Sequence, residues 1–409
     1  MTTGITNLSL GANAKISYLV QTAAGAIDAS PAWKTIPVDS FDPQVQPNQL
    51  ENNALTGHRD RLAPRSGTVN AQVTASGRLY PVIYEDLLEA AFQGTWGAKF
   101  ALTGLEITVN ETAKTFTRAS GSWITDGVVV GDRITFSGFA ETGPPDETPN
   151  NGTFVVTEVT SATVLTFGDA TVLVDTAAAR TVNATTPSDY LKVGSTKRKI
   201  AIEAHYSDAD DGNGEYQRFV DLEVASIAFS VGAQGDVNMN LSLVGGTELD
   251  LGANIADEIA GATYTETALD FFDSFSGFLN MDASSVATIT SMTPNIDNQS
   301  NPLFIIGSRY PGAVSHGKVN ANIDVTVFYT DNTIKEKFQD EDDVAMHLSF
   351  ANGPTGNVNT MSLQYPNGRI ISFGRPVGGE TEIIQNLTLQ PYRNDDLETS
   401  VILQRYNPA

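Results

Sequence analysis

Cysteine is absent from the 409 residues of the chain, and basic residues are scarce. The lack of cysteine excludes disulfide bonds, thiolate metal sites and cysteine nucleophiles, although it leaves the redox compartment open. Only 24 Lys and Arg stand against 48 Asp and Glu, which gives a formal net charge of −24. Tight, non-specific binding to duplex DNA depends on cations that neutralise phosphates, so the composition argues against it.

Long apolar runs are also missing. No segment approaches the roughly 18 uninterrupted apolar residues that a membrane helix needs. Residues 1–20 carry one lysine and no apolar core before a cleavage site, so we expect no secretory signal. With 41% hydrophobic and 18% charged residues, the chain is expected to fold, and its length suffices for two or three domains. We therefore expect a soluble protein that is made in a cytoplasm.

The sequence does contain the alternation of apolar and polar residues that is typical of β-strands. This alternation recurs in residues 67–75, 219–231, 317–325 and 383–389, with Gly, Asn, Asp and Pro clusters between the runs. Helical spacing is convincing in residues 84–93 and 332–339. The fold class is therefore predicted to be mainly β.

These elements occur twice in the same order. GTVNAQVTA from Gly67 matches GKVNANIDV from Gly317, and each is followed by a predicted helix that ends in Phe-Gln. Three further matches follow: AIEAH from Ala201 with VAMH from Val344, Ile227-Ala-Phe229 with Ile371-Ser-Phe373, and NLSL from Asn240 with NLTL from Asn386. Four weak matches in one order indicate a tandem duplication.

Spacing locates a third part. Phe92 and His205 are 113 residues apart, but Phe338 and His347 are only 9 apart, and the two halves realign afterwards. Residues 97–194 are therefore predicted to be an inserted small all-β module, which has Trp123, Phe136, Phe154 and Phe167 to bury. Residues 1–96 and 195–262 then form the first half and residues 263–409 the second.

Five stretches carry a resemblance to a known family. They are GANAKISYLVQTAAG from Gly11, YEDLLEAAFQGTW from Tyr84, EYQRFVDLEVASIAFSV from Glu215, residues 275–329 with NPLFIIGSRYPGAVSHGKVNANIDVTVFY, and GRPVGGETEIIQNL from Gly374. These stretches resemble the tail tube (major tail) proteins of bacteriophages with long, flexible tails, and they cover most of the chain outside the insert. The insert looks like a small β module that recurs in phage tail proteins.

The resemblance implies a fold for each half: two packed antiparallel sheets, a β-sandwich close to a barrel, with one flanking helix. It also implies a structural virion protein without catalytic residues or cofactors. Its copies would close into rings and stack into a tube, assembled in the cytoplasm of the bacterial host. Family rings present six tube domains, so three of these two-domain chains are expected to close a ring, in preference to six chains.

The resemblance further implies partners. The tube would hold the tape-measure protein during assembly, meet tail terminator and distal tail proteins at its ends, and pass genomic DNA without specific binding. Acidic residues are expected to face the channel and repel the phosphate backbone near the wall. The insert, which the second half lacks, is expected on the outside of the tube.

The sequence contains no complete catalytic, nucleotide-binding or metal-binding motif. Gly312-Ala-Val-Ser-His-Gly-Lys318 fits GxxxxGK, but Val319 follows where a P-loop needs Ser or Thr. The acidic stretch from Asp208 has Asn213 and Phe219 where a calcium loop needs Gly and Glu, which favours a hairpin tip. Four histidines form no HExxH motif, although His205 and His347 suggest a repeated strand position. We expect no catalytic, cofactor or metal site.

Cations gather before each of the two matching strands, which is unusual in so acidic a chain. They are Arg59, Arg61 and Arg65 before the first, and Arg309, His316 and Lys318 before the second. One interpretation is ordinary solvated loop charge. The other is that these six residues contact acidic surfaces of a neighbouring subunit, such as the DEDD run from Asp340, and hold rings together.

An alternative function is an extracellular β-sandwich protein that binds carbohydrate or a receptor, such as part of a tail fibre. Such a protein would expose aromatic platforms. Trp33, Trp96 and Trp123 are scattered, and each lies in an apolar run that is typical of a core.

Overall fold

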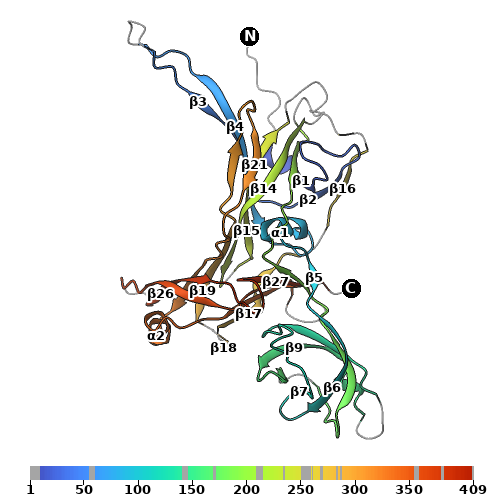
Figure 1. Ribbon diagram of the computed structural model, residues 1–409. Coiled ribbons are helices and arrows are strands. Elements are labelled where there is room, and N and C mark those ends of the chain that lie inside the picture. Colours follow the sequence, from blue (N-terminus) through green and yellow to red (C-terminus); the bar gives the residue numbers. More distant parts are fainter. Residues whose placement is uncertain are drawn as a thin grey trace.

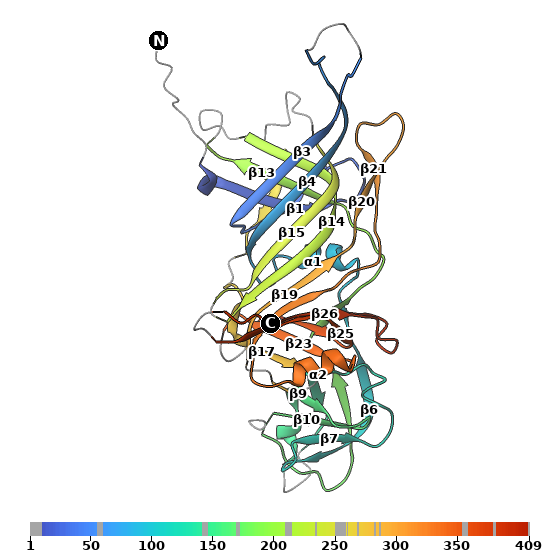
Figure 2. The same cartoon turned by 90° about the vertical axis from the view of Figure 1, so that its left-hand side faces the viewer.

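The computed structural model describes residues 10–54, 60–140, 146–168, 172–208, 215–233, 235–249, 259, 261–267, 270–281, 284–285, 288–353, 359–378 and 382–407. Over these residues the chain is mainly β with two α-helices, which confirms the predicted fold class. Figure 1 shows an elongated molecule with a long hairpin, β3 (Ser40–Leu50) and β4 (Arg65–Arg78), at one end and a small barrel at the other. The view in Figure 2 shows the same two ends.

The first half is a two-layer β structure. Its further elements are β1 (Ala14–Val20), β2 (Ala32–Ile36), α1 (Glu85–Phe92), β13 (Ile200–Tyr206), β14 (Glu215–Gly232) and β15 (Asn238–Glu248). One layer has the order β2-β1-β13-β14, and the other has the order β14-β15-β4-β3. The 18-residue strand β14 serves both layers, and a bulge between Val224 and Ser226 lets it bend.

The second half repeats this order. Its elements are β17 (Asp273–Met281), β18 (Ser284–Ser285), β19 (Ile289–Asp297), β22 (Ile323–Phe328), α2 (Thr333–Gln339), β23 (Met346–Ala351), β24 (Thr360–Tyr365), β25 (Gly368–Gly374) and β26 (Ile384–Pro391). The layers run β18-β17-β23-β24 and β25-β26-β22-β19. Strands β24 and β25 take the place of β14, because Pro366 and Asn367 interrupt the pairing.

Both predicted helices are present. In α1, Leu87, Leu88 and Ala91 are buried against the core, as their spacing predicts, while Glu85 and Asp86 suit the positive end of the helix dipole. At the start of α2, the backbone amide of Thr333 donates a hydrogen bond to Asp331 Oδ1 at 2.9 Å. Each helix lies between the fourth and fifth strands of its half.

The two halves join edge to edge. Strand β14 pairs antiparallel with β19, and the resulting path β3-β4-β15-β14-β19-β22-β26-β25 is antiparallel throughout. One buried cluster of apolar residues extends through both halves. Asn298 is fully buried at this joint, where its amide donates to the carbonyls of Ala91 and Val224 at 2.9 and 3.0 Å. The halves therefore share one sheet and one core.

The smaller elements lie around this frame. The hairpin β20 (Asn301–Phe304) and β21 (Pro311–Ser315) extends from the connection between β19 and β22. Strand β16 (Thr263–Thr265) pairs parallel with β2, and β27 (Ile402–Tyr406) pairs with β24. Two short 3-10 turns are η1 (Gly11–Asn13) and η2 (Thr148–Asn150).

The stretch between α1 and β13 forms a closed six-stranded barrel in the order β10-β7-β6-β11-β8-β9. Its strands are β6 (Ala101–Asn110), β7 (Thr115–Arg118), β8 (Arg133–Ser137), β9 (Gly152–Val159), β10 (Val164–Phe167) and β11 (Arg180–Thr185). It has a core of its own, in which Trp123, Phe136 and Phe167 are buried and Phe154 is partly buried. Its two connections, β5 (Gly97–Ala98) and β12 (Asp189–Lys192), pair with each other, and β12 pairs with β27 of the second half.

The pairing refines the sequence matches. Leu243 pairs with Val73 and Leu389 pairs with Ile323, in the register that the sequence predicts. The match of Ile227 with Ile371, however, is two residues out of register. Ile227 pairs with Leu241 whereas Phe373 pairs with Leu387, so Ile227 corresponds to Phe373. Side chains two residues apart lie on the same face of a strand, so a sequence match that is shifted by two residues still fits the alternation of apolar and polar residues.

The predicted strand over residues 317–325 is shorter than expected. Strand β22 begins only at Ile323, and before it Asn320 forms an isolated bridge with Asp297. The two histidines of the match also differ in their surroundings. His205 stacks on Tyr216, with ring centroids 4.2 Å apart, whereas the side chain of His347 is buried beneath the barrel.

Candidate assembly interface

One face of the eight-stranded path points away from the core, and we call it the polar face. Along each strand its residues alternate with residues that point into the core. It comprises Ser40, Asp42, Gln44, Gln46, Asn70, Gln72, Thr74, Ser76, Ser226, Ala228, Ser230, Asn238, Asn240, Ser242, Ser291, Thr293, Asn295, Asp297, Asp324, Thr326, Ser372, Gly374, Asn386 and Thr388.

Hydroxyl and amide side chains dominate the polar face. It includes three aspartates and neither lysine nor arginine, although the chain as a whole carries a net charge of −24. The same alternation continues at the strand ends to Arg78 of β4 and Arg369 of β25, which pair with Asp236 and Asp343. This composition gives a surface that is almost neutral.

The path ends in two strands that have a partner on one side only among the described residues, β3 and β25. Apolar side chains along these edges are incompletely covered: Phe41, Val45 and Phe373 are half-buried, and Val377 just beyond β25 is 75% exposed. An edge strand with unpaired backbone groups is a template for pairing with another strand. Both edges are therefore candidate contact surfaces.

The hairpins β3–β4 and β20–β21 lie together at the end of the molecule opposite the barrel (Figures 1 and 2). The backbone amide of Val69 donates to the carbonyl of Arg309 at 2.7 Å, which ties the second hairpin to the first. Arg61, Arg65 and Arg309 are exposed here, and Arg61 lies 3.9 Å from Glu51. Three of the predicted cations are thus brought to one end.

The other predicted cations differ. Lys318 is exposed, whereas the imidazole of His316 is only 7% exposed and lies 2.7 Å from Glu223 Oε2 and 2.8 Å from the hydroxyl of Ser300. The side chain of His316 thus has partners within the chain. Arg59 lies outside the described residues, as do residues 209–214 of the acidic stretch that resembled a calcium loop.

An apolar tip accompanies these cations. Leu303, Phe304, Ile305 and Ile306, at and after the end of β20, are 45%, 44%, 61% and 106% exposed. Contiguous exposed apolar residues on a soluble protein mark contact surfaces. The sequence signal for this tip is the run LFII between Pro302 and Gly307, which carries no charge and fits no catalytic motif.

The barrel is fixed to the second half by a buried polar network. Asp132 of the barrel is fully buried and its Oδ2 lies 2.6 Å from Lys99 Nζ. Its Oδ1 accepts hydrogen bonds from the hydroxyl of Tyr190 at 3.0 Å and from Gln364 Nε2 at 3.2 Å. Because Gln364 belongs to β24, this single carboxylate links the barrel to the sheet beneath it.

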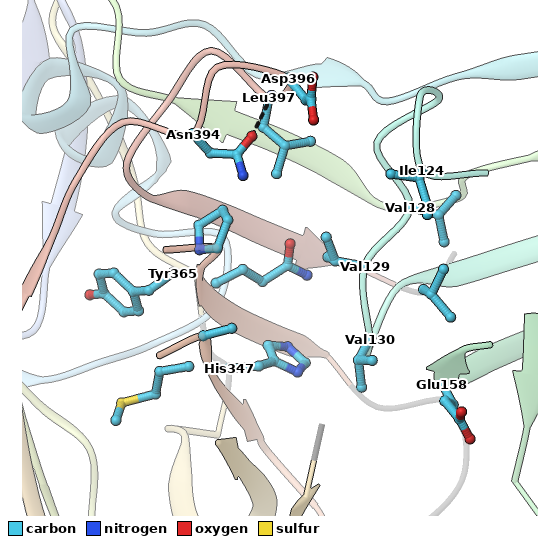
Figure 3. A pocket seen from close by; sticks show the side chains of 15 residues that line it. Ile124, Val128, Val129, Val130, Glu158, His347, Tyr365, Asn394, Asp396 and Leu397 are labelled. Atoms are coloured by element: carbon cyan, nitrogen blue, oxygen red, sulfur yellow. Dashed lines mark hydrogen bonds between the residues drawn. The ribbon is translucent and has the colours of Figure 1, made fainter. Parts of the chain in front are cut away.

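A cleft of about 530 Å³ opens beside this network (Figure 3). Val128, Val129 and Val130 of the barrel line one side, and His347 and Leu397 of the second half line the other. Burial lowers the pKa of His347 to about 4, against a smaller opposing effect of Asp132, so the imidazole is neutral at pH 7. The cleft belongs to the joint between barrel and tube half.

The remaining motifs take no functional arrangement. No helix begins at Lys318, as a P-loop would require: residues 316–319 have no regular secondary structure, and the next element is strand β22, which begins at Ile323. Among the described residues, no three His, Asp or Glu side chains gather as a metal site would, and no helix is long and apolar enough to span a membrane. Trp33 and Trp123 are fully buried, and the ring of Trp96 is covered by Arg405, so the tryptophans offer no platform for a sugar.

A profile of the phage tail tube protein family matches residues 11–391. The match takes in both tube halves and the barrel between them, so the chain belongs to the phage tail tube protein family. It is therefore a structural component of the phage tail, from a family that is not a family of enzymes. A comparison with curated proteins found no match.

The network around Asp132 leads to a prediction. Asp132→Ala leaves the ammonium of Lys99 buried without its carboxylate, so we expect the free energy of unfolding to fall by about 3 kcal/mol or more. Asp132→Asn, which keeps one acceptor oxygen, should lose less. Urea unfolding followed by circular dichroism measures both. Asp395→Ala is the control, because that carboxylate is 99% exposed, and a loss equal to that of Asp132→Ala would contradict the role of the network.

Proposed function

We propose that this chain is the repeating subunit of the tube, and that copies of it close into rings around a channel whose wall is the polar face. The observation that carries the proposal is the eight-stranded antiparallel path, which has a neutral polar face and an open edge at each end. Pairing of one copy's open edge with the next copy's would extend the sheet around a closed ring, in which no edge remains.

A ring of three chains fits the duplication. Each chain supplies two halves with the same strand order, so three chains would place six halves around the channel. The joint between β14 and β19 shows how one half can follow another in a continuous sheet.

The polar face suits a conduit for genomic DNA. Phosphate binding in DNA complexes comes largely from Lys and Arg. The residues that make up the polar face include neither, and the arginines at its margin, Arg78 and Arg369, are paired with Asp236 and Asp343. Its three aspartates repel phosphate only within roughly a Debye length of about 8 Å. DNA would thus pass without adhering, and before ejection the same channel would hold the tape-measure protein. Tail terminator and distal tail proteins would contact the two ends of the tube.

We propose that the barrel lies on the outside of the tube. Its connection β12 extends the layer β18-β17-β23-β24-β27, which is the layer that does not carry the polar face. The strands next to the barrel carry the buried polar residues His347, Ser349, Ser362, Gln364 and Gln404, of which His347 lies against Gly131 and Gln364 bonds Asp132 of the barrel. Because these side chains are polar, that surface is compatible with water if the barrel is removed.

Rings would stack through the hairpin end, where Arg61, Arg65, Arg309 and the apolar tip meet. An exposed acidic run from Asp340 follows α2, away from the hairpins (Figure 2). Opposite charges on the two ends of a subunit would favour head-to-tail stacking.

The direct test is electron microscopy of the purified protein. We expect rings or tubes whose averaged images have three chains per ring. Six chains per ring would overturn the argument from duplication while leaving the tube function intact. Isolated particles that bind glycans would instead support the carbohydrate-binding alternative.

Charge reversal tests the hairpin end. Replacing Arg59, Arg61 and Arg65 by Glu should shorten tubes while leaving the thermal unfolding of the isolated subunit nearly unchanged. Single exposed pairs contribute only about 0–1 kcal/mol, but each contact recurs around the ring. The matched Arg→Gln triple variant should have an intermediate effect, since it removes attraction without adding repulsion. Tubes of normal length from the Glu variant would mean that these arginines are ordinary solvated loop charge.

Deletion tests the position of the barrel. Ala98 and Asp189 are paired across β5 and β12, so residues 99–188 can be replaced by an Asn-Gly turn that keeps both strands. We expect folded protein that still forms tubes, narrower in outer diameter and unchanged in channel width. A folded deletion variant that forms no tubes would show that the barrel takes part in assembly.

A further inference from the structure

The chain contains one joint between consecutive halves, and this joint has a defined register. Across it, Ser226 pairs with Asp297, Ile227 with Ile296, and Ala228 with Asn295, and the same register continues to Gly232 and Ser291. The joint is closely packed, because Ile227 and Ile296 are 0% and 1% exposed.

Strand β3 corresponds to β19 residue by residue. Pro43 of β3 pairs with Val73, and Pro294 of β19 pairs with Ile323, which are equivalent positions of the two halves. The sequences then align as SFDPQVQ from Ser40 and SMTPNID from Ser291. Gln44, Val45 and Gln46 therefore correspond to Asn295, Ile296 and Asp297. This further repeat emerges only once the pairing is known.

Strand β25 corresponds in the same way to the second part of β14. Both strands have a bulge at the same place, between Val224 and Ser226 in β14 and between Ile370 and Ser372 in β25. Ser226 pairs with Ser242, and Ser372 pairs with Thr388. Ser372, Phe373 and Gly374 thus correspond to Ser226, Ile227 and Ala228.

We propose that a ring closes by antiparallel pairing of β25 with β3 of a second copy, in the register of the β14–β19 joint. Ser372 then lies opposite Gln46 of the partner subunit, Phe373 opposite Val45 of the partner subunit, and Gly374 opposite Gln44 of the partner subunit. This inference rests on the proposed ring assembly and specifies its contact surface.

The exposure of equivalent residues supports this pairing. Met292 and Ile296 are 2% and 1% exposed inside the joint, whereas their counterparts Phe41 and Val45 on the open edge are only half-buried. Ile227 is fully buried, whereas its counterpart Phe373 is only half-buried. The open edges thus carry the apolar side chains of a closed joint without the strand that covers them.

Proline on β3 does not forbid the pairing. A proline lacks the amide hydrogen of a sheet ladder and is usually confined to edge strands. Pro294, however, lies in β19, which has β14 on one side and β22 on the other. Because Pro43 occupies the equivalent position, β3 can accept a neighbour on its open side as β19 does.

The polar face also continues across such a joint. The row Asp42, Thr74, Ser242, Ser226 and Asp297 runs across five strands of the first half and the joint. The corresponding row Thr293, Asp324, Thr388 and Ser372 ends at the open edge of β25. In the proposed pairing, Gln46 of the partner subunit lies next to Ser372 and extends this second row by one residue. Gln46 is the residue that corresponds to Asp297 in the first row, and it is neutral.

The absence of cysteine makes the register directly testable. In the double variant Ser372→Cys with Gln46→Cys, the two thiols of neighbouring copies would face each other within the Cα separation of about 4.4–6.8 Å that a disulfide requires. Mild oxidation of assembled rings or tubes should give covalent oligomers on a non-reducing gel, and each single variant should give none. If rings contain three chains, the ladder should end at the trimer.

Two control variants frame this result. The double variant Ser226→Cys with Asp297→Cys places cysteines at the equivalent pair inside one chain and should form an internal disulfide. It shows how efficiently a pair in this register is oxidised. Ser372→Cys with Gln44→Cys is shifted by two residues on the same face and should cross-link several-fold less. Rings that cross-link better in the shifted variant, or not at all in the matched one while the internal control reacts, would overturn the register but leave the tube function standing. Failure of the unmodified protein to form rings would count against both.

Discussion

The requirement that a β-strand have a partner on each side governs this molecule. The antiparallel pairing of β14 with β19 satisfies it between the halves, and in doing so it produces one continuous sheet and one apolar core. Asn298 shows how much depends on this joint, because its buried Nδ2 donates hydrogen bonds to the carbonyls of Ala91 and Val224. Strands β3 and β25, at the two ends of the eight-stranded path, have no strand partner on their outer sides within the described part of the chain. Those two edges are therefore the candidate surfaces for assembly.

The two layers of the molecule have opposite roles because their outer faces differ. The layer that contains β3, β15 and β22 presents Ser, Thr, Asn and Gln to water, with little charge. The other layer carries buried polar side chains next to the barrel, and the Asp132 carboxylate, bonded to Gln364, links the barrel to it. The negative charge of the chain lies mainly outside the polar face. In the proposed tube, the channel wall and the barrel outside it could therefore change independently.

Local sequence patterns predicted the helices, the barrel aromatics and the repeated strands, because burial on one face leaves a period that can be read along the chain. They did not predict the β14–β19 joint, since pairing between distant strands has no local signature. The match of SFDPQVQ with SMTPNID was missed because only Ser and Pro are identical. The shift by two at Ile227 went unnoticed because alternation has a period of two. Likewise, the charged run from Asp340 was visible, whereas the neutral composition of the polar face required knowing which strands are neighbours.

Duplication makes the two kinds of joint chemically different. The two strands of the β14–β19 joint belong to one chain, so the linker holds them at a high effective concentration and they can pair as the chain folds. This joint can therefore contain apolar residues such as Ile227 and Ile296, which are buried in it. An open edge of the same composition would pair indiscriminately before assembly. Strand β3 differs from β19 in ways that oppose such pairing: Asp42 stands where β19 has Thr293, and Pro47 adds a second proline near the hairpin end. In the proposed ring, the edges would thus keep the register of the internal joint, while Asp42 and Pro47 would disfavour pairing of the open edge before the ring forms.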